Sequence, residues 1–137
     1  MIRMSIRGAI ASALLALVAL GSAHAGPVTV VAAEFHDAGD GRWTVLVTLR
    51  HADTGWDHYA DNWRVVDGAG NVLGERVLHH PHVEEQPFTR GLRDVHVPED
   101  VSTVYVVARD TVHGWSEHRL AVDLTMVRDG HLRVEAD

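Results

Sequence analysis

The stretch Trp43-Thr-Val-Leu-Val-Thr-Leu49 decides the fold class of this chain. Successive side chains of a β-strand point to opposite faces, so a strand here would place Trp43, Val45, Val47 and Leu49 together on one face. Such a period of two is typical of a half-buried strand and does not fit the period of a helix.

Similar short segments flank this stretch and are separated by turns rich in Gly, Asp, Asn and Pro. The further predicted strands span residues 28–35, 63–66, 72–78, 88–97, 104–108, 120–124 and 132–134. Seven or eight strands at this spacing predict an all-β fold, an immunoglobulin-like or fibronectin-like antiparallel β-sandwich. Trp43 and Trp63 lie on strands and are expected in its core.

The first 25 residues have the three parts of an export signal. A basic start is followed by an apolar run over residues 9–20 and by small residues in Ala23-His-Ala25. The run is shorter than the roughly 20 residues that span a bilayer. We expect residues 1–25 to be a signal peptide cut after Ala25; the alternative cut after Ala23 would leave His24 first.

The domain organisation that follows is a signal peptide over 1–25 and a single sandwich domain over 26–137. Such a protein is expected in the periplasm or secreted, with no membrane insertion after cleavage.

The chain carries a formal charge of −7 and no lysine, and loss of Arg3 and Arg7 would make it more acidic. An acidic surface repels phosphate backbones and anionic headgroups, which argues against nucleic acid and lipid partners. The chain has no cysteine, which excludes disulfides and thiolate ligands.

Strand parity predicts where the connections lie. If consecutive strands are antiparallel, connections alternate between the two ends of the sandwich. One end, which we call the loop end, then receives residues 50–62, 79–88 and 110–117. The connections at the other end are plain turns, whereas those of the loop end hold six histidines, two tryptophans and a tyrosine. Binding residues are commonly carried on loops over a rigid scaffold.

Histidines of the loop end are candidate metal ligands. His80-Pro-His82 is the sharpest local signal, because proline and the residue before it favour extended backbone, where residues two apart project to the same side. Imidazole and carboxylate without thiolate favour Cu(II), Zn(II) or Ni(II). The candidate ligands are His51, His58, His79, His80, His82, His113 and Glu84. Asp57, Asp110 and Glu84 are expected to orient the imidazoles, and Glu85 is expected to pair with Arg90.

Other interpretations of the same residues stay open. Trp56, Tyr59 and Trp115 could stack on a sugar, a peptide or a partner protein in a metal-free binding module. His58 and His113 could be hydrogen-bonded histidines packed on those aromatic rings. A calcium site built from Asp53, Asp57, Asp61 and Asp110 fits no known loop spacing, and His36, His96 and His131 are interpreted as ordinary surface residues. The chain shows no nucleophile elbow, phosphate loop or zincin motif, so an enzyme is not predicted.

Three motifs carry a resemblance: Gly55-Trp-Asp-His-Tyr-Ala-Asp61, Leu78-His-His-Pro-His-Val-Glu-Glu-Gln-Pro-Phe-Thr-Arg90 and His113-Gly-Trp115. With them the chain resembles an uncharacterised group of small exported bacterial β-sandwich proteins, and the resemblance implies no activity. In size, compartment and architecture the chain is also similar to periplasmic copper-handling β-sandwiches, although its loop end lacks methionine. The function expected from the sequence is an exported copper or zinc carrier or buffer, whose partners are the ion and a periplasmic protein.

Overall fold

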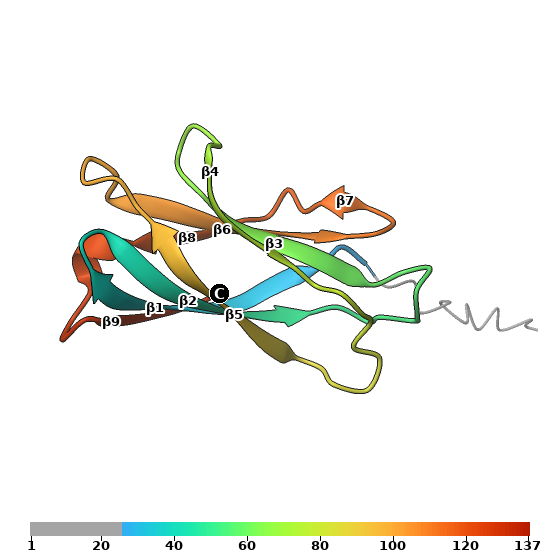
Figure 1. Cartoon of the computed structure of the whole chain (residues 1–137). Coiled ribbons are helices and arrows are strands. Elements are labelled where there is room, and N and C mark those ends of the chain that lie inside the picture. Colours follow the sequence, from blue (N-terminus) through green and yellow to red (C-terminus); the bar gives the residue numbers. More distant parts are fainter. Residues whose placement is uncertain (1–25) are drawn as a thin grey trace, which may run out of the picture.

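The computed structural model describes residues 26–137, so the expected signal peptide lies outside the described residues. Two antiparallel sheets face each other (Figure 1). The first sheet has the order β5 (Phe88–His96), β2 (Arg42–Arg50), β1 (Thr29–Gly39), β9 (His131–Glu135). The second has the order β4 (Val72–Val77), β3 (Ala60–Val66), β6 (Thr103–Asp110), and then β7 (Gly114–Trp115) and β8 (Leu120–Asp123), which both pair with β6. A single turn of 3-10 helix, η1 (Leu124–Met126), precedes β9.

The β-sandwich predicted from the sequence is confirmed. The described part of the chain forms nine strands rather than seven or eight, and β7 is the element that the sequence pattern missed. β7 is only two residues long, and a period of two cannot be recognised over two residues.

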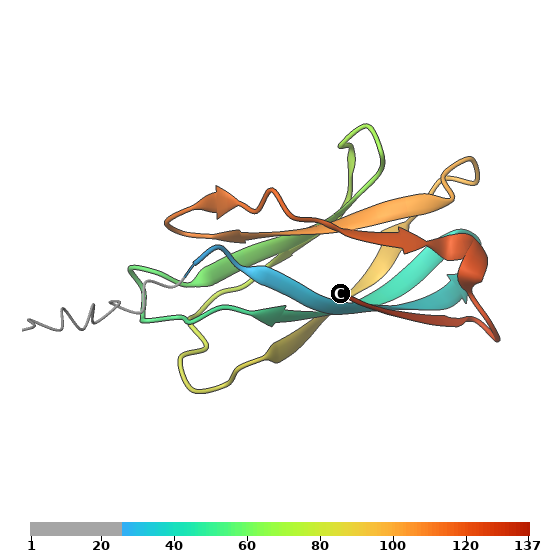
Figure 2. The same cartoon turned by 180° about the vertical axis from the view of Figure 1, so that it is seen from behind.

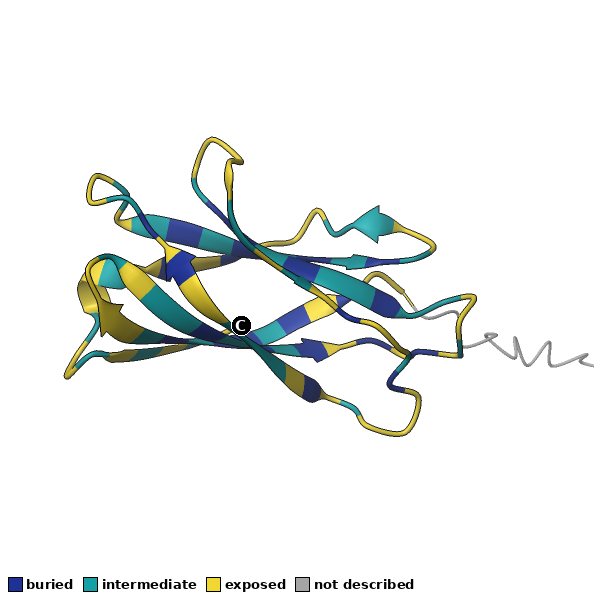
Figure 3. Ribbon diagram, in the orientation of Figure 1, coloured by how far each residue is buried: buried dark blue, intermediate teal, exposed yellow. Residues whose placement is uncertain are grey.

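The core lies between the two sheets and comes from the alternating faces of their strands (Figure 3). Val45, Val47 and Leu49 of β2 are fully buried, as the alternation predicts, and Trp63 of β3 is buried opposite them. Trp43 is only partly buried and packs edge-on against Phe35, with ring centroids 6.1 Å apart.

At one side of the sandwich the edge strands β4 and β5 approach closely. Gly74 of β4 makes this possible, because a Cβ atom built there would lie 3.0 Å from methyl groups of both Leu92 and Val95 of β5. Real Cβ atoms almost never come closer, so a side chain on Gly74 would force these methyl groups of β5 to shift.

The loop end exists in space as parity predicts. The connections β2–β3, β4–β5 and β6–β7 all lie at the end where Thr29 pairs with Arg50 (Figure 1). Hydrogen bonds join them across the sequence: the His82 amide donates to Asp53 over 2.8 Å, and the Tyr59 amide donates to Thr111 over 3.2 Å. Seen from behind, β1 also starts at this end, beside the β6–β7 hairpin (Figure 2). Within residues 26–137 no helix has the length and apolar character needed to cross a bilayer.

Candidate metal centre

Three side chains converge at the loop end. His51 follows β2, His58 precedes β3, and Asp110 is the last residue of β6. The Nε2 atoms of His51 and His58 are 3.2 Å apart, and the Nε2 atom of His58 is 3.0 Å from Oδ1 of Asp110. One ligand atom from each of the three residues lies within 4.8 Å of the other two. These atoms therefore form a compact set of two nitrogens and one oxygen.

Two of the three separations in this set, both to Nε2 of His58, match those of ligands around one small ion. Zinc-to-nitrogen and zinc-to-oxygen distances of 2.0–2.2 Å in a tetrahedron place neighbouring ligand atoms about 3.3 Å apart. The two short separations in the cluster, 3.2 and 3.0 Å, are close to that value. Without an ion, a proton on Nε2 of His58 can be shared between Nε2 of His51 and Oδ1 of Asp110. A cation at the centre of the cluster would replace this proton.

A buried carboxylate stands behind His51. Oδ1 of Asp53 lies 2.5 Å from Nδ1 of His51 and accepts the Ala60 amide over 2.9 Å, while Oδ2 accepts the His82 amide. Burial by itself would raise the pKa of Asp53, but these hydrogen bonds lower the pKa below its usual value. An ionised Asp53 fixes the proton of His51 on Nδ1 and leaves the lone pair of Nε2 for a ligand. This is the carboxylate–histidine–metal arrangement found behind many metal sites.

Asp110 is held equally firmly. Its Oδ1 atom accepts the backbone amides of Val112 and His113 over 2.9 and 2.8 Å. Burial would raise the pKa of Asp110, but the bonds from His113 and Val112 lower it, so the side chain is an anion at neutral pH. Nδ1 of His113 lies 3.0 Å from the same oxygen, and its ring centroid is 5.1 Å from that of His58. His113 is thus the nearest further imidazole to the cluster.

The β2–β3 loop is folded to present His58. The His58 amide donates to the carbonyl of Gly55, and the His58 carbonyl accepts the Thr54 amide. Gly55 has φ of 142°, in a region that other residues rarely adopt, so the glycine permits this tight turn. His58 is consequently fixed between His51 and Asp110 rather than extended into solvent.

The β4–β5 loop places its histidines differently. The His80 and His82 rings are neighbours, with centroids 4.5 Å apart, but neither belongs to the cluster. The His82 ring stacks on Phe88 with centroids 3.9 Å apart, and Arg90 Nη2 lies 2.9 Å from its Nε2 atom. A guanidinium only donates hydrogen bonds, so this nitrogen of His82 is already used as an acceptor. Burial, Arg90 and His80 lower the pKa of His82.

The remaining predicted site residues lie at the loop end around the cluster of His51, His58 and Asp110. His79, Glu84 and Glu85 are exposed, and Glu85 pairs with Arg90 over 3.4 Å, as the sequence suggested. The Asp57 side chain is exposed, and only its carbonyl is used, as an acceptor for Thr111. Trp56 is 67% exposed and packs edge-on against Tyr59, whereas Trp115 lies under the guanidinium of Arg64.

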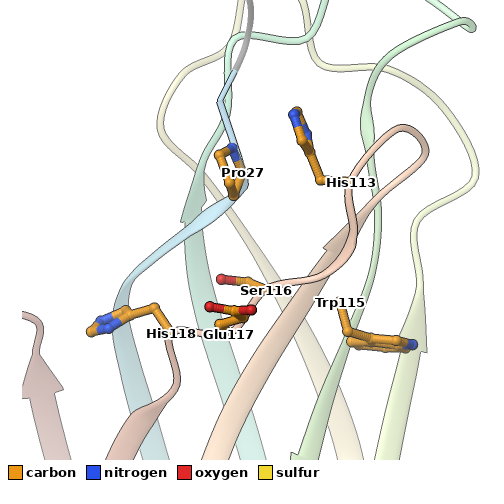
Figure 4. Close-up of a pocket in the computed structure, with 6 residues that line it drawn as sticks. All are labelled: Pro27, His113, Trp115, Ser116, Glu117 and His118. Atoms are coloured by element: carbon orange, nitrogen blue, oxygen red, sulfur yellow. The ribbon is translucent and has the colours of Figure 1, made fainter.

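A cavity of about 420 Å³ opens beside the cluster. Figure 4 shows the six residues that line it, Pro27, His113, Trp115, Ser116, Glu117 and His118. His113 belongs both to this cavity and to the hydrogen bonds of Asp110. The cavity therefore adjoins the cluster on the side where the chain enters β1.

Asp53 is the residue that sequence reasoning missed. The sequence places it only in a calcium site that fits no loop spacing, whereas in the structure its carboxylate contacts Nδ1 of His51. The spacing His51-Ala-Asp53 is a local signal for this contact, because side chains two apart in an extended segment share a side.

A protein of Halomicrobium mukohataei that bears the name "Putative lipoprotein" is 40% identical over 94 residues. The match covers 69% of this chain but only 46% of that protein, so the chain spans about half the length of this relative. No family model and no solved structure matches the chain.

Proposed function

We propose that this protein is an exported metal-binding protein that carries or buffers Cu(II) or Zn(II) at the loop end. His51, His58 and Asp110 would hold the ion, and Asp53 would orient His51. The observation that carries the proposal is the convergence of two imidazole nitrogens and a carboxylate oxygen within 4.8 Å, each from a different segment of the chain. Export is supported by the signal-like residues 1–25 and by the name of the Halomicrobium mukohataei relative.

The chemistry of the ligand set supports these two ions. Two imidazoles and one carboxylate suit zinc and copper, and copper binds such sites more tightly by the Irving–Williams order. Three protein ligands leave a fourth position for water or for His113. Deprotonated Asp110 also neutralises one of the two charges of a divalent ion.

The exposure of the outer histidines supports a role in carrying a metal ion. The His51 side chain is fully buried, but 15% of the His58 side chain and 37% of the His113 side chain are exposed. An ion could therefore enter from the His113 side without unfolding of the loops. A carrier needs this combination of a fixed inner ligand and a reachable outer one.

The test is a Zn(II) titration of the tag-free protein by calorimetry, compared with His58→Ala and with His79→Ala as the matched control. His79 is an exposed histidine of the same end that lies outside the cluster. We expect His58→Ala to weaken the tightest binding event by at least about tenfold, since even changes behind the ligands cost that much. His79→Ala should bind like the wild type. Equal affinities for His58→Ala and the wild type would contradict the proposal.

The exposure of Trp56 favours a second candidate, a metal-free module that stacks its ligand on the aromatic side chains. Its signature would be a wild-type protein that is indifferent to Cu(II) and Zn(II) and whose tryptophan fluorescence responds to soluble oligosaccharides or peptides. Trp56→Ala would abolish that fluorescence response.

A further inference from the structure

We propose a second, solvent-exposed metal site on the outer face of β1 and β9, held by His36, His131 and Glu34. This site is independent of the loop end. Because Thr29 of β1 lies at the loop end and His36 is seven residues further along the strand, the second site lies towards the opposite end of the sandwich (Figure 1).

The strand register brings these side chains together. His36 pairs with His131 and Glu34 pairs with Arg133 across the antiparallel β1–β9 ladder. Phe35 and Leu132, their neighbours, contribute to the core, so the four polar side chains lie on the outer face. The His131 amide and carbonyl are both bonded to Arg128, which makes His36 and His131 a non-hydrogen-bonded pair. Side chains approach most closely in such pairs.

The geometry offers one ligand atom from each residue. The two imidazole centroids are 4.5 Å apart, and the three ligand atoms lie within 4.8 Å of one another. Nε2 of His131 is 3.8 Å from Oε1 of Glu34, and Nε2 of His36 is 4.0 Å from Oε2. These separations exceed the roughly 3.3 Å of a tetrahedral site, so the side chains must close slightly around an ion. Nearly half of each imidazole side chain is exposed, which leaves them free to do so.

Arg133 is the competitor for Glu34. Its Nη1 atom donates to Oε1 of Glu34 over 3.2 Å, and its Nε atom donates to Glu135 over 3.1 Å. An ion that takes Glu34 would displace only one of these two bonds, because Glu135 keeps the guanidinium nearby. Loss of the bond from Arg133 to Glu34 costs free energy, so this site should bind more weakly than the loop end.

Cu(II) is the ion that this site should prefer. Two imidazoles from adjacent strands give tetragonal copper two nitrogen ligands without deforming the sheet, and copper is the strongest binder in the divalent series. Glu34 would supply an oxygen, and water would complete the shell. The exposed position suits an ion that exchanges with the surroundings.

The experiment is a Cu(II) titration of the full tag-free chain carrying His58→Ala, followed by electron paramagnetic resonance. The substitution His58→Ala weakens the loop-end site if that site exists, and it does not touch the site on β1 and β9. The proposal for the loop end and the proposal for β1 and β9 can therefore be rejected independently. We expect one bound Cu(II) with a two-nitrogen hyperfine pattern. His36→Asn or His131→Asn added to this background should each weaken that ion by at least about tenfold.

His96→Asn is the matched control, because His96 is an exposed strand histidine that lies outside the cluster. It should leave the spectrum and the affinity unchanged. Unchanged Cu(II) binding in both His36→Asn and His131→Asn would overturn the proposal, as would an equal loss in His96→Asn.

Discussion

At the scale of single residues, His82 shows how a histidine in a promising motif can serve the fold instead. Its ring lies flat on Phe88, and its Nε2 atom accepts from Arg90. Its Nδ1 atom is buried and has no hydrogen-bond partner among the described residues. Burial disfavours the charged form of the ring, and a protonated ring would put a second cation beside Arg90, so the pKa of His82 is lowered.

The lowered pKa predicts a pH dependence of stability. The unfolded chain takes up a proton on His82 near pH 6.5, whereas the folded chain does so only at lower pH. The free energy of unfolding should therefore fall as the pH drops below about 6.5, until the folded pKa is reached. His82→Gln cannot titrate, so its loss of stability between pH 7 and pH 5 should be smaller than that of the wild type.

Urea unfolding midpoints at both pH values, measured in the presence of a chelator, give the comparison. His79→Gln removes an exposed neighbouring histidine, and its midpoint should fall between pH 7 and pH 5 by as much as that of the wild type. If the midpoints of His82→Gln and of the wild type fell equally between pH 7 and pH 5, the pKa of His82 would be the same in the folded and unfolded chains.

The same residues show what the sequence could reveal about the site. The alternation of antiparallel strands predicted that four residues of the site share one end of the sandwich. The structure places them together there: His51, His58, Asp110 and His113. The stiff backbone of His80-Pro-His82 does bring the two rings together. However, the contact of Arg90 with His82 depends on how β5 returns to the loop, and spacing along the chain carries no information about it.

At the scale of elements, alternation was sufficient for the long strands because each buries one face on a single core. It failed for β7, which exists only because the chain turns tightly after Asp110 and pairs two residues with β6. Gly114 has φ of 75° in this turn, and a glycine in a turn is a weak signal by itself. Short strands of this kind are defined by their partner rather than by their own sequence.

The contact between β4 and β5 predicts the effect of a small change. Gly74→Ala would push its methyl group against Leu92 and Val95 and should destabilise the fold by about 1–3 kcal/mol, the usual cost of overpacking. Gly68→Ala is the control, because nothing lies within 4 Å of a Cβ atom there. Chemical denaturation of both variants measures the difference, and equal midpoints would mean that the methyl groups of Leu92 and Val95 give way without cost.

At the scale of the whole molecule, the start of β1 and the candidate metal centre share one end. Pro27 lines the same cavity as His113. We expect the exported protein to begin at Gly26, and intact mass of the protein from its native compartment measures this. A mass that retains His24 and Ala25 would instead place an amino-terminal imidazole three residues from Pro27. That is a reach of about 10 Å, enough to enter the cavity as a further ligand.

The entry of the chain at the loop end also gives the domain a direction. Any anchor joined ahead of Gly26 would hold the loop end towards its point of attachment, while His36 and His131 would face away from it. On a cell envelope the buried cluster would then sit on the inward side and the exposed histidine pair on the outward side. The two candidate metal sites would then lie at opposite poles of one small domain.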